Sequence, residues 1–511
     1  MAFYSILFEN RPDYQQIQAA EMPAFFVDLN LDQVVNAITA GRQEYDLKPF
    51  FYFPIHALET VQYRQAVAQD LEGDSVLETI RAFAQQMVMV RRYLGMVSGL
   101  DYHYHKAGWF LEAALIYCQA IQTLARDLSV VELKSRGLLN FREYLNSYVN
   151  SAYFQSLQAE TAQRKAEQAS IRYAIIIKGN RVGVRKYEAE ADYSQEVERT
   201  FEKFKQGAVK DYRANVIKGS GFNHVEAQIL DCVARLYPKI FAALDAYCEK
   251  HQHFLDETIR VFDREIQFYV AYLEYIQRIK RAGLPFCYPE VTPGRKDIFA
   301  QDSFDIALAN KLVAEDGRVV CNDFFLNGSE RVIVVSGPNQ GGKTTFARMF
   351  GQLHYLAGLG FPVPGRQARL FLYDRLFTHF EKQENIKNLR GKLHDDLVRI
   401  HEILEQASPE SIIIMNEIFT STTLKDAVFL SKKVMERILQ LDLLCVCVTF
   451  IDELSSLSEK TVSMVSTIVP DNPAQRTFKI IRKPADGLAY AISIAEKYRL
   501  TYRLLKERIR G

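Results

Sequence analysis

The sequence has almost no net charge and no long apolar run. Its 63 lysines and arginines balance 62 aspartates and glutamates, leaving +1, so any basic surface must be local. No stretch reaches the roughly 18 apolar residues of a membrane-spanning helix. Residues 1–5 lack the basic segment that precedes the apolar core of a signal peptide. We therefore expect a cytoplasmic protein that does not associate with membranes.

Cysteine is also scarce. The chain has 511 residues and seven cysteines, none of them spaced as Cys-x-x-Cys. An odd number without such pairs argues against a disulfide framework and a zinc ribbon. Cys445 and Cys447 fall in the apolar run 443–448 and are expected to be small buried residues of a strand. The length exceeds that of one hydrophobic core, so two or three domains are expected.

The most informative stretch is a glycine-rich segment between an apolar run and a helical pattern. The run 332–335 predicts a buried parallel strand, and the following Gly337-x4-Gly342-Lys343-Thr344 has the spacing of a P-loop. Glycines let successive main-chain N–H groups face phosphates, and the helix N-terminus adds partial positive charge. A glycine-rich turn with a stray lysine is the alternative interpretation, but the flanking strand and helix both agree with the motif.

This motif predicts that the chain binds a nucleoside triphosphate and Mg2+. Lys343 is expected to reach the outer phosphates, and Thr344 is expected to bring its hydroxyl group to the metal. The predicted nucleotide-binding residues are Gly337, Pro338, Asn339, Gln340, Gly341, Gly342, Lys343, Thr344 and Thr345.

A second apolar run, 411–417, ends in polar groups about 70 residues after the loop. P-loop ATPases place their magnesium and water-handling groups at such a strand end. Glu417 is the predicted catalytic residue, which would orient or deprotonate the attacking water. Asn416 occupies the magnesium position and is expected to act through a bound water. A third apolar strand, 443–449, is expected beside this one.

The first half of the chain predicts a helical region interrupted by one hairpin. Apolar residues recur at three- and four-residue spacing from 55 to 150, and the polar stretch 152–170 predicts a solvent-exposed helical rod. The β-rich runs 171–178 and 181–187, joined at Gly179-Asn180, predict a β hairpin. Glycines and prolines from 283 to 294 mark the main domain boundary.

The hairpin region is locally basic. Between residues 172 and 218, eleven lysines and arginines stand against seven aspartates and glutamates, an excess of four. Such a hairpin can contact a phosphate backbone without reading sequence. A solvated hairpin of mixed charge is the alternative. The predicted DNA-binding residues are Lys178, Arg181, Arg185 and Lys186.

Several motifs together resemble the MutS family of DNA mismatch repair ATPases. The segments that carry the resemblance are 320–323, 337–345, 374–378, 416–418 with Thr422 and Asp426, and 484–495. The resemblance implies a multidomain protein: an all-α core and lever region with a small β clamp, followed by an α/β P-loop ATPase domain of the ABC type. We expect the first domain over 1–283, with the clamp at about 165–222. The second is expected over 284–511, with a C-terminal helical dimerisation element.

The resemblance also implies that the nucleotide is ATP and that the protein is a homodimer that binds double-stranded or branched DNA. Four departures from the family pattern qualify this expectation. Asn416 replaces the magnesium aspartate and brings no charge, and Phe450 replaces a histidine that donates a hydrogen bond. The Ser-Thr pair expected near 389–393 is missing. At the amino terminus Phe8 and Glu9 are adjacent, so no Phe-x-Glu is available there to read a mismatch.

The preferred hypothesis is a nucleotide-gated, MutS-like DNA clamp with weak ATP hydrolysis and no mismatch-reading module. A second hypothesis is an ATP-binding regulator that does not hydrolyse ATP and acts through a protein partner. A third, an SMC-type or transporter-type ATPase, shares the loop and strand. It is disfavoured because no long coiled-coil insertion separates the two motifs and no apolar spans exist.

Overall fold

The computed structural model describes residues 3–179, 181–188, 224–381, 391–469, 472–485 and 506. The chain divides into two compact units, which are treated separately below. Unit 1 contains residues 74–132 and 139–263, and unit 2 contains residues 3–73, 133–138 and 264–511.

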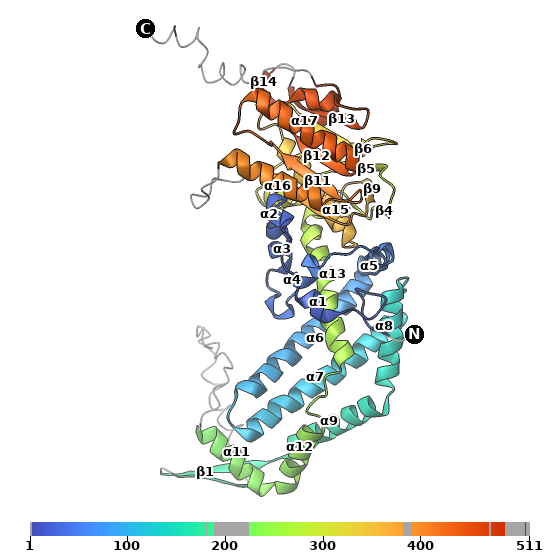
Figure 1. Cartoon of the computed structure of the whole chain (residues 1–511). Coiled ribbons are helices and arrows are strands. Elements are labelled where there is room, and N and C mark those ends of the chain that lie inside the picture. The colour runs from blue at the N-terminus through green and yellow to red at the C-terminus, as the bar shows by residue number, and fades with distance from the viewer. Residues whose placement is uncertain are drawn as a thin grey trace. The chain divides into compact units, whose positions relative to one another are not determined.

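Unit 1 is helical with one β hairpin, as predicted. The long helices α6 and α7 lie side by side (Figure 1). Phe254 packs in the core between the rings of Phe110 and Tyr117, with centroid distances of 5.3 and 5.4 Å. The elements are α6 (Asp74–Gly99), α7 (His103–Val130), most of α8 (Arg136–Val149), α9 (Ala152–Ser170), β1 (Tyr173–Lys178), β2 (Arg181–Lys186), α11 (His224–Leu236), α12 (Pro238–Lys250) and the start of α13 (Glu257–Arg281).

Helix α9 corrects one prediction. Its polar composition predicted a solvent-exposed rod, but Phe154, Leu157 and Thr161 are buried and the helix packs on α7 and α12. These residues are spaced by three and four, so they form one narrow stripe along the helix. The Thr161 hydroxyl group lies 2.6 Å from the Tyr247 hydroxyl group of α12. The average composition hid this stripe because the other faces of the helix are polar.

Unit 2 is built on a six-stranded sheet with the order β10-β11-β12-β7-β13-β14. The first five strands are parallel, and β14 runs antiparallel to β13. Helix α15 covers one face, whereas buried residues of α16 and α17 pack with alternate residues of β7, β11 and β12 on the other. A second sheet has the order β4-β9-β5-β6. This mixture of strands and helices confirms the predicted α/β character of the second half.

The strands of unit 2 are β3 (Phe286–Cys287), β4 (Glu290–Thr292), β5 (Ile298–Ser303), β6 (Asn322–Leu326), β7 (Val332–Ser336), β8 (Val363–Pro364), β9 (Gln367–Phe371), β10 (Leu376–Phe380), β11 (Ile412–Asn416), β12 (Leu444–Val448), β13 (Thr461–Val469) and β14 (Asn472–Arg482). Its helices are α1 (Tyr14–Gln18), α2 (Phe25–Asp28), α3 (Leu31–Thr39), η1 (Gln43–Tyr45), α4 (Lys48–Tyr52), α5 (Leu58–Leu71), the remainder of α13, α14 (Ile306–Ala314), α15 (Lys343–Gly358), α16 (Lys392–Gln406), α17 (Leu424–Leu441) and η2 (Asp452–Ser456).

The amino-terminal segment packs with the sheet domain. The ring of Phe361, just after α15, packs against the rings of Phe51, Phe268 and Tyr272, with centroid distances of 6.1, 4.6 and 4.0 Å. Residues 3–73 therefore group with unit 2, and the division into units falls inside α13 at 263/264. The sequence predicted the domain boundary at the glycines and prolines of 283–294. These residues directly follow the end of α13 at Arg281.

Part of the sequence-based prediction falls outside the described residues. This applies to the clamp segment 189–223, to Leu389 and Arg390, and to all of the C-terminal element after 485 except Lys506. Within the described part of the chain, no helix combines the length and apolar character needed to cross a bilayer.

Candidate functional site

The glycine-rich loop connects β7 to α15 at the carboxyl end of a central strand. All five residues of β7 are buried, and α15 begins at Lys343. Gly337 and Gly342 have φ angles of 111° and 90°, values that strongly favour glycine. At Gly341 a Cβ atom would lie 2.2 Å from the Ser466 Oγ atom. The loop therefore needs its glycines for both backbone conformation and space.

Lys343 lies folded against its own loop. Its Nζ atom donates to the carbonyl oxygens of Gly337 and Pro338, at 3.0 and 3.1 Å, and to Asn339 Oδ1 at 3.4 Å. The ammonium group also lies 4.9 Å from the centre of the Phe450 ring. Burial lowers the pKa of Lys343, and the nearby Glu417 carboxylate opposes this shift. The hydrogen-bond acceptors of this buried cation are all neutral oxygens, so an anionic ligand would compete well for its N–H groups.

A cavity of about 350 Å³ lies beside the loop. Residues 339–345 form one wall, and Leu308, Glu417 and Phe478 complete the lining. Seven of the nine predicted nucleotide-binding residues therefore line the cavity, while Gly337 and Pro338 contribute carbonyl groups to Lys343. The N-terminus of α15 borders the same space, and a helix N-terminus favours anions.

Thr344 and Glu417 both line this cavity, although about 70 residues separate them in sequence, and Asn416 contacts Thr344. The Thr344 hydroxyl group donates to Asn416 Oδ1 at 2.8 Å. Glu417 follows directly with a φ angle of 55°, and its N–H donates to the Val448 carbonyl oxygen at 2.9 Å. This arrangement directs Glu417 toward the cavity. Burial raises the pKa of the Glu417 carboxyl group, Lys343 opposes the rise, and Glu381 adds to it.

The donor set suits a magnesium ion that keeps most of its own water. Thr344 and Asn416 offer two neutral oxygens, and Glu417 is the carboxylate in the cavity lining. Across the described ranges, no group of three or more His, Cys, Asp or Glu side chains forms a metal cage. Mg2+ is commonly held by few protein groups together with substrate phosphates, so these residues fit a nucleotide-bound metal better than a resident one.

Two residues that support the loop were not predicted. Ser466 of β13 donates to the Gly341 carbonyl oxygen at 2.7 Å, and Arg476 of β14 donates to that of Asn339 at 3.1 Å. Both lie more than 120 residues after the loop, so no local spacing connects them to it. The strand β13 also contains Ser463 and two threonines, so its sequence does not single out Ser466.

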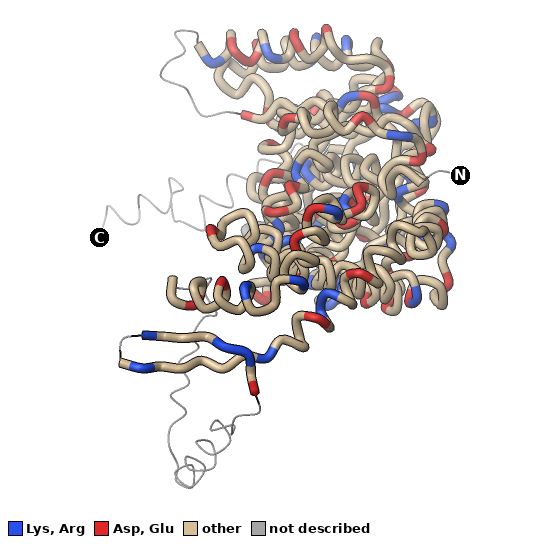
Figure 2. The backbone as a smooth tube through the Cα atoms, turned by 90° about the horizontal axis from the view of Figure 1, so that it is seen from below, with Lys and Arg blue, Asp and Glu red and all other residues tan. Residues whose placement is uncertain are grey.

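The hairpin distributes its four predicted DNA-binding residues over two faces. Directly opposed residues of an antiparallel pair share a face, and the pairs include Lys178 with Arg181, Ala174 with Arg185 and Tyr173 with Lys186. Lys178, Arg181 and Arg185 therefore lie on one face. Lys186 lies on the other, where its ammonium group sits 5.3 Å from the centre of the Tyr237 ring. Figure 2 shows basic positions at the turn and at the base of the hairpin.

Comparison with known proteins gives consistent matches over part of the chain. The family model of MutS domain V matches residues 333–507. The DNA mismatch repair protein MutS of Zymomonas mobilis is 30% identical over 224 residues, which cover 42% of this chain and 26% of that protein. Endonuclease MutS2 of Gemmatimonas aurantiaca is 27% identical over 192 residues, which cover 37% of this chain and 23% of that protein. DNA mismatch repair protein Msh3 of Mus musculus is 28% identical over 151 residues, which cover 30% of this chain and 14% of that protein. The matched part thus spans about a quarter or less of these relatives.

The contact between Ser466 and the loop generates a prediction. Ser466→Ala removes one buried hydrogen bond, worth about 0.5–1.5 kcal/mol, and we expect it to weaken ATP binding roughly two- to tenfold. Isothermal titration calorimetry measures this change. Ser463→Ala is the matched control, because Ser463 lies on the same strand and its Oγ atom makes no hydrogen bond among the described residues. Equal affinities of the two variants would contradict the role assigned to Ser466.

Proposed function

Because the chain belongs to the MutS family of DNA mismatch repair proteins, we propose that it is an ATP-binding, DNA-associated clamp whose nucleotide state controls its grip on DNA. The observation that carries the nucleotide part is the cavity beside the loop, where Lys343, Thr344 and Glu417 converge. A cytoplasmic homodimer is part of the same proposal.

ATP hydrolysis is expected to be slow. Bound ATP supplies the phosphoanhydride bond and Mg2+ neutralises part of its charge; this chain supplies the groups around them. Asn416 accepts from Thr344 in the arrangement that an aspartate would adopt, but its amide carries no charge to attract the metal. Phe450 contacts Lys343 through its ring and offers no hydrogen bond to a phosphate. Glu417 remains as the group that orients or deprotonates water.

A route for nucleotide-dependent change exists within unit 2. Helix α15, which begins at Lys343, holds the C-terminal end of α2. Arg348 Nε donates to the Asp28 carbonyl oxygen at 2.9 Å, and Gln352 Nε2 donates to the Leu29 carbonyl oxygen at 2.8 Å. The Asp28 carboxylate accepts from the Thr378 hydroxyl group of β10 at 2.6 Å. Movement of the loop and α15 would therefore act directly on the amino-terminal segment. That segment continues through α5 into α6, the first helix of unit 1.

The basic face of the hairpin supports the DNA part of the proposal. Lys178, Arg181 and Arg185 are all exposed, and they lie on the same face of the hairpin. Three cations on one face of an exposed ribbon suit a phosphate backbone, which is recognised by charge rather than by sequence.

The second candidate function is an ATP-binding regulator without hydrolysis, which acts through a protein partner. Asn416 and Phe450 favour it, because both remove groups that assist hydrolysis. A chemical measurement separates the two functions.

Single-turnover release of phosphate provides that measurement. We expect slow, Mg2+-dependent release by the unmodified chain and none by Glu417→Gln. Asn416→Asp restores the charge at the metal position while keeping the oxygen that accepts from Thr344, so we expect at least a tenfold increase, equivalent to about 1.4 kcal/mol. Absence of release from both the unmodified chain and Asn416→Asp would contradict the hydrolytic clamp and support the regulator.

Charge reversal on the hairpin tests the DNA contact. The triple variant Lys178→Glu, Arg181→Glu and Arg185→Glu should lose affinity for duplex DNA by at least an order of magnitude and show a smaller salt dependence, because about three phosphate contacts disappear. Fluorescence anisotropy over a salt series measures both quantities.

The control for this experiment keeps the charge. Lys178→Arg, Arg181→Lys and Arg185→Lys should bind duplex nearly as well as the unmodified chain, since phosphate contacts depend mainly on charge. Unchanged affinity of the charge-reversed variant would remove the hairpin from the proposed interface.

A further inference from the structure

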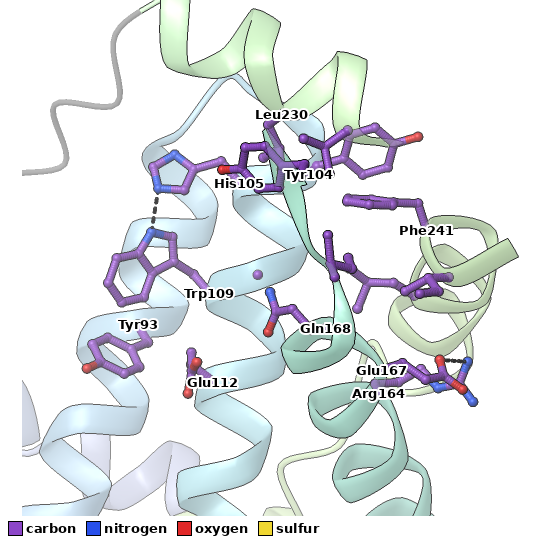
Figure 3. Close-up of a pocket in the computed structure, with 16 residues that line it drawn as sticks. Tyr93, Tyr104, His105, Trp109, Glu112, Arg164, Glu167, Gln168, Leu230 and Phe241 are labelled. Atoms are coloured by element: carbon purple, nitrogen blue, oxygen red, sulfur yellow. Dashed lines mark hydrogen bonds and ion pairs between the residues drawn. The ribbon is translucent and has the colours of Figure 1, made fainter. Parts of the chain in front are cut away.

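Unit 1 contains a half-open pocket that the proposed function does not use. Its volume is about 640 Å³, and it lies among α6, α7, α9, α11 and α12 at the start of β1. Figure 3 shows Tyr93, His105 and Trp109 on one side of this pocket and Phe241 on the other. The pocket therefore has aromatic walls at the base of the hairpin.

The aromatic wall on α6 and α7 is held in a fixed orientation. The rings of Tyr93 and Trp109 lie 4.7 Å apart at an angle of 53°. The Trp109 indole N–H donates to His105 Nε2 at 2.8 Å. Indole nitrogen is only a donor, so this His105 nitrogen must be the acceptor of a neutral ring, and burial lowers the His105 pKa accordingly. The indole is thus preorganised to present a flat surface.

Polar groups lie between the two walls. Glu112 forms an ion pair with Lys165, which also donates to Gln168 Oε1 at 3.2 Å. Glu167 pairs with Arg164 at 2.9 Å. Both carboxylates are thus compensated by cations of α9, which disfavours a cationic ligand. The carboxylate of Glu112 and the amide nitrogen of Gln168 remain suited to a neutral ligand edge that carries both donors and acceptors.

Gly108 keeps the floor of the pocket open. It lies inside α7, where glycine costs about 1 kcal/mol relative to alanine. A Cβ atom built at this position would meet nothing within 4 Å, so close packing does not require glycine there. The residue lines the pocket beside Trp109, and a large side chain would occupy the space next to the indole.

We propose that this pocket binds one unstacked nucleobase of a bulged or locally opened nucleic acid. A base offers a flat face to Trp109 and a neutral edge of donors and acceptors to Glu112 and Gln168. The inference rests on the proposed DNA contact, because Tyr173 belongs to both the pocket lining and β1. Tyr173 and Lys186 share one face of the hairpin, so Lys186 is the cation on the pocket side, and the pocket receives a nucleobase that has left the stack. A fully paired duplex has no such base to offer.

The experiment uses Trp109 as its own reporter, because it is the single tryptophan of the chain. Two probes are compared without ATP: a duplex with one unpaired purine bulge and the same duplex fully paired. Stacking contributes roughly 1–3 kcal/mol per base, so we expect the bulged duplex to bind at least fivefold more tightly and to quench Trp109 fluorescence. Gly108→Leu should remove both the quenching and the preference. The matched control is Gly95→Leu, at an equally open helical glycine of α6 that does not line the pocket, and it should retain both.

Each other result decides against the inference. Equal binding of the two duplexes with unchanged fluorescence would overturn it while leaving the hairpin contact in place. Preference and quenching that persist in Gly108→Leu would also overturn it. Gly108→Ala serves as a milder variant if circular dichroism shows that the leucine variant is unfolded, and it should reduce the preference. Failure to bind either duplex would overturn the DNA part of the proposed function and this inference together.

Discussion

The structure of unit 2 depends on one constraint, the tight curvature of the chain between Ser336 and Lys343. That curvature requires positive φ angles at Gly337 and Gly342 and a position at Gly341 where no side chain fits against Ser466. It directs the main chain and the N-terminus of α15 toward the cavity. It also leaves Lys343 buried with neutral oxygens as its hydrogen-bond acceptors, one aromatic ring beside it, and the Glu417 carboxylate as a nearby negative charge. Burying a cation is costly, and an anionic ligand that accepts its hydrogen bonds lowers that cost.

The rest of unit 2 supports this loop from three directions. Strand β13 holds it through Ser466, β11 places Asn416 against Thr344, and the C-terminal end of α2 is hydrogen-bonded to α15. The amino-terminal segment is therefore part of the nucleotide unit in its packing, although it is distant in sequence. Unit 1 carries a different kind of surface: a basic face on a β ribbon and an aromatic pocket at its base.

Local patterns in the sequence predicted local structure well. The apolar run before the loop is β7, and the two runs around Gly179 pair as β1 and β2. The meeting of Thr344 with Glu417 followed from the motif, because the carboxyl ends of parallel strands share one edge of a sheet. The buried stripe of α9 was missed because only three of its 19 residues are buried. The mean polarity of the helix therefore predicted an exposed rod.

Long-range contacts could not be predicted from spacing. Nothing in the local sequence of Ser466 or Arg476 indicates that β13 and β14 return beside the loop. The grouping of residues 3–73 with unit 2 depends on aromatic packing around Phe361, which no boundary signal encodes. The aromatic pocket joins residues from α6, α7, α9, α11, α12 and β1, and no local spacing in the sequence connects these elements.

The central claim is that Lys343 and the curved loop bind the phosphates of ATP. Equilibrium titration of Mg2+-ATP into the unmodified chain and into Lys343→Ala tests it most directly, with Lys433→Ala on the surface of α17 as the control. We expect saturable binding to the unmodified chain and the control, and a loss of at least a hundredfold in Lys343→Ala. Equal affinity of all three proteins for ATP would contradict the claim.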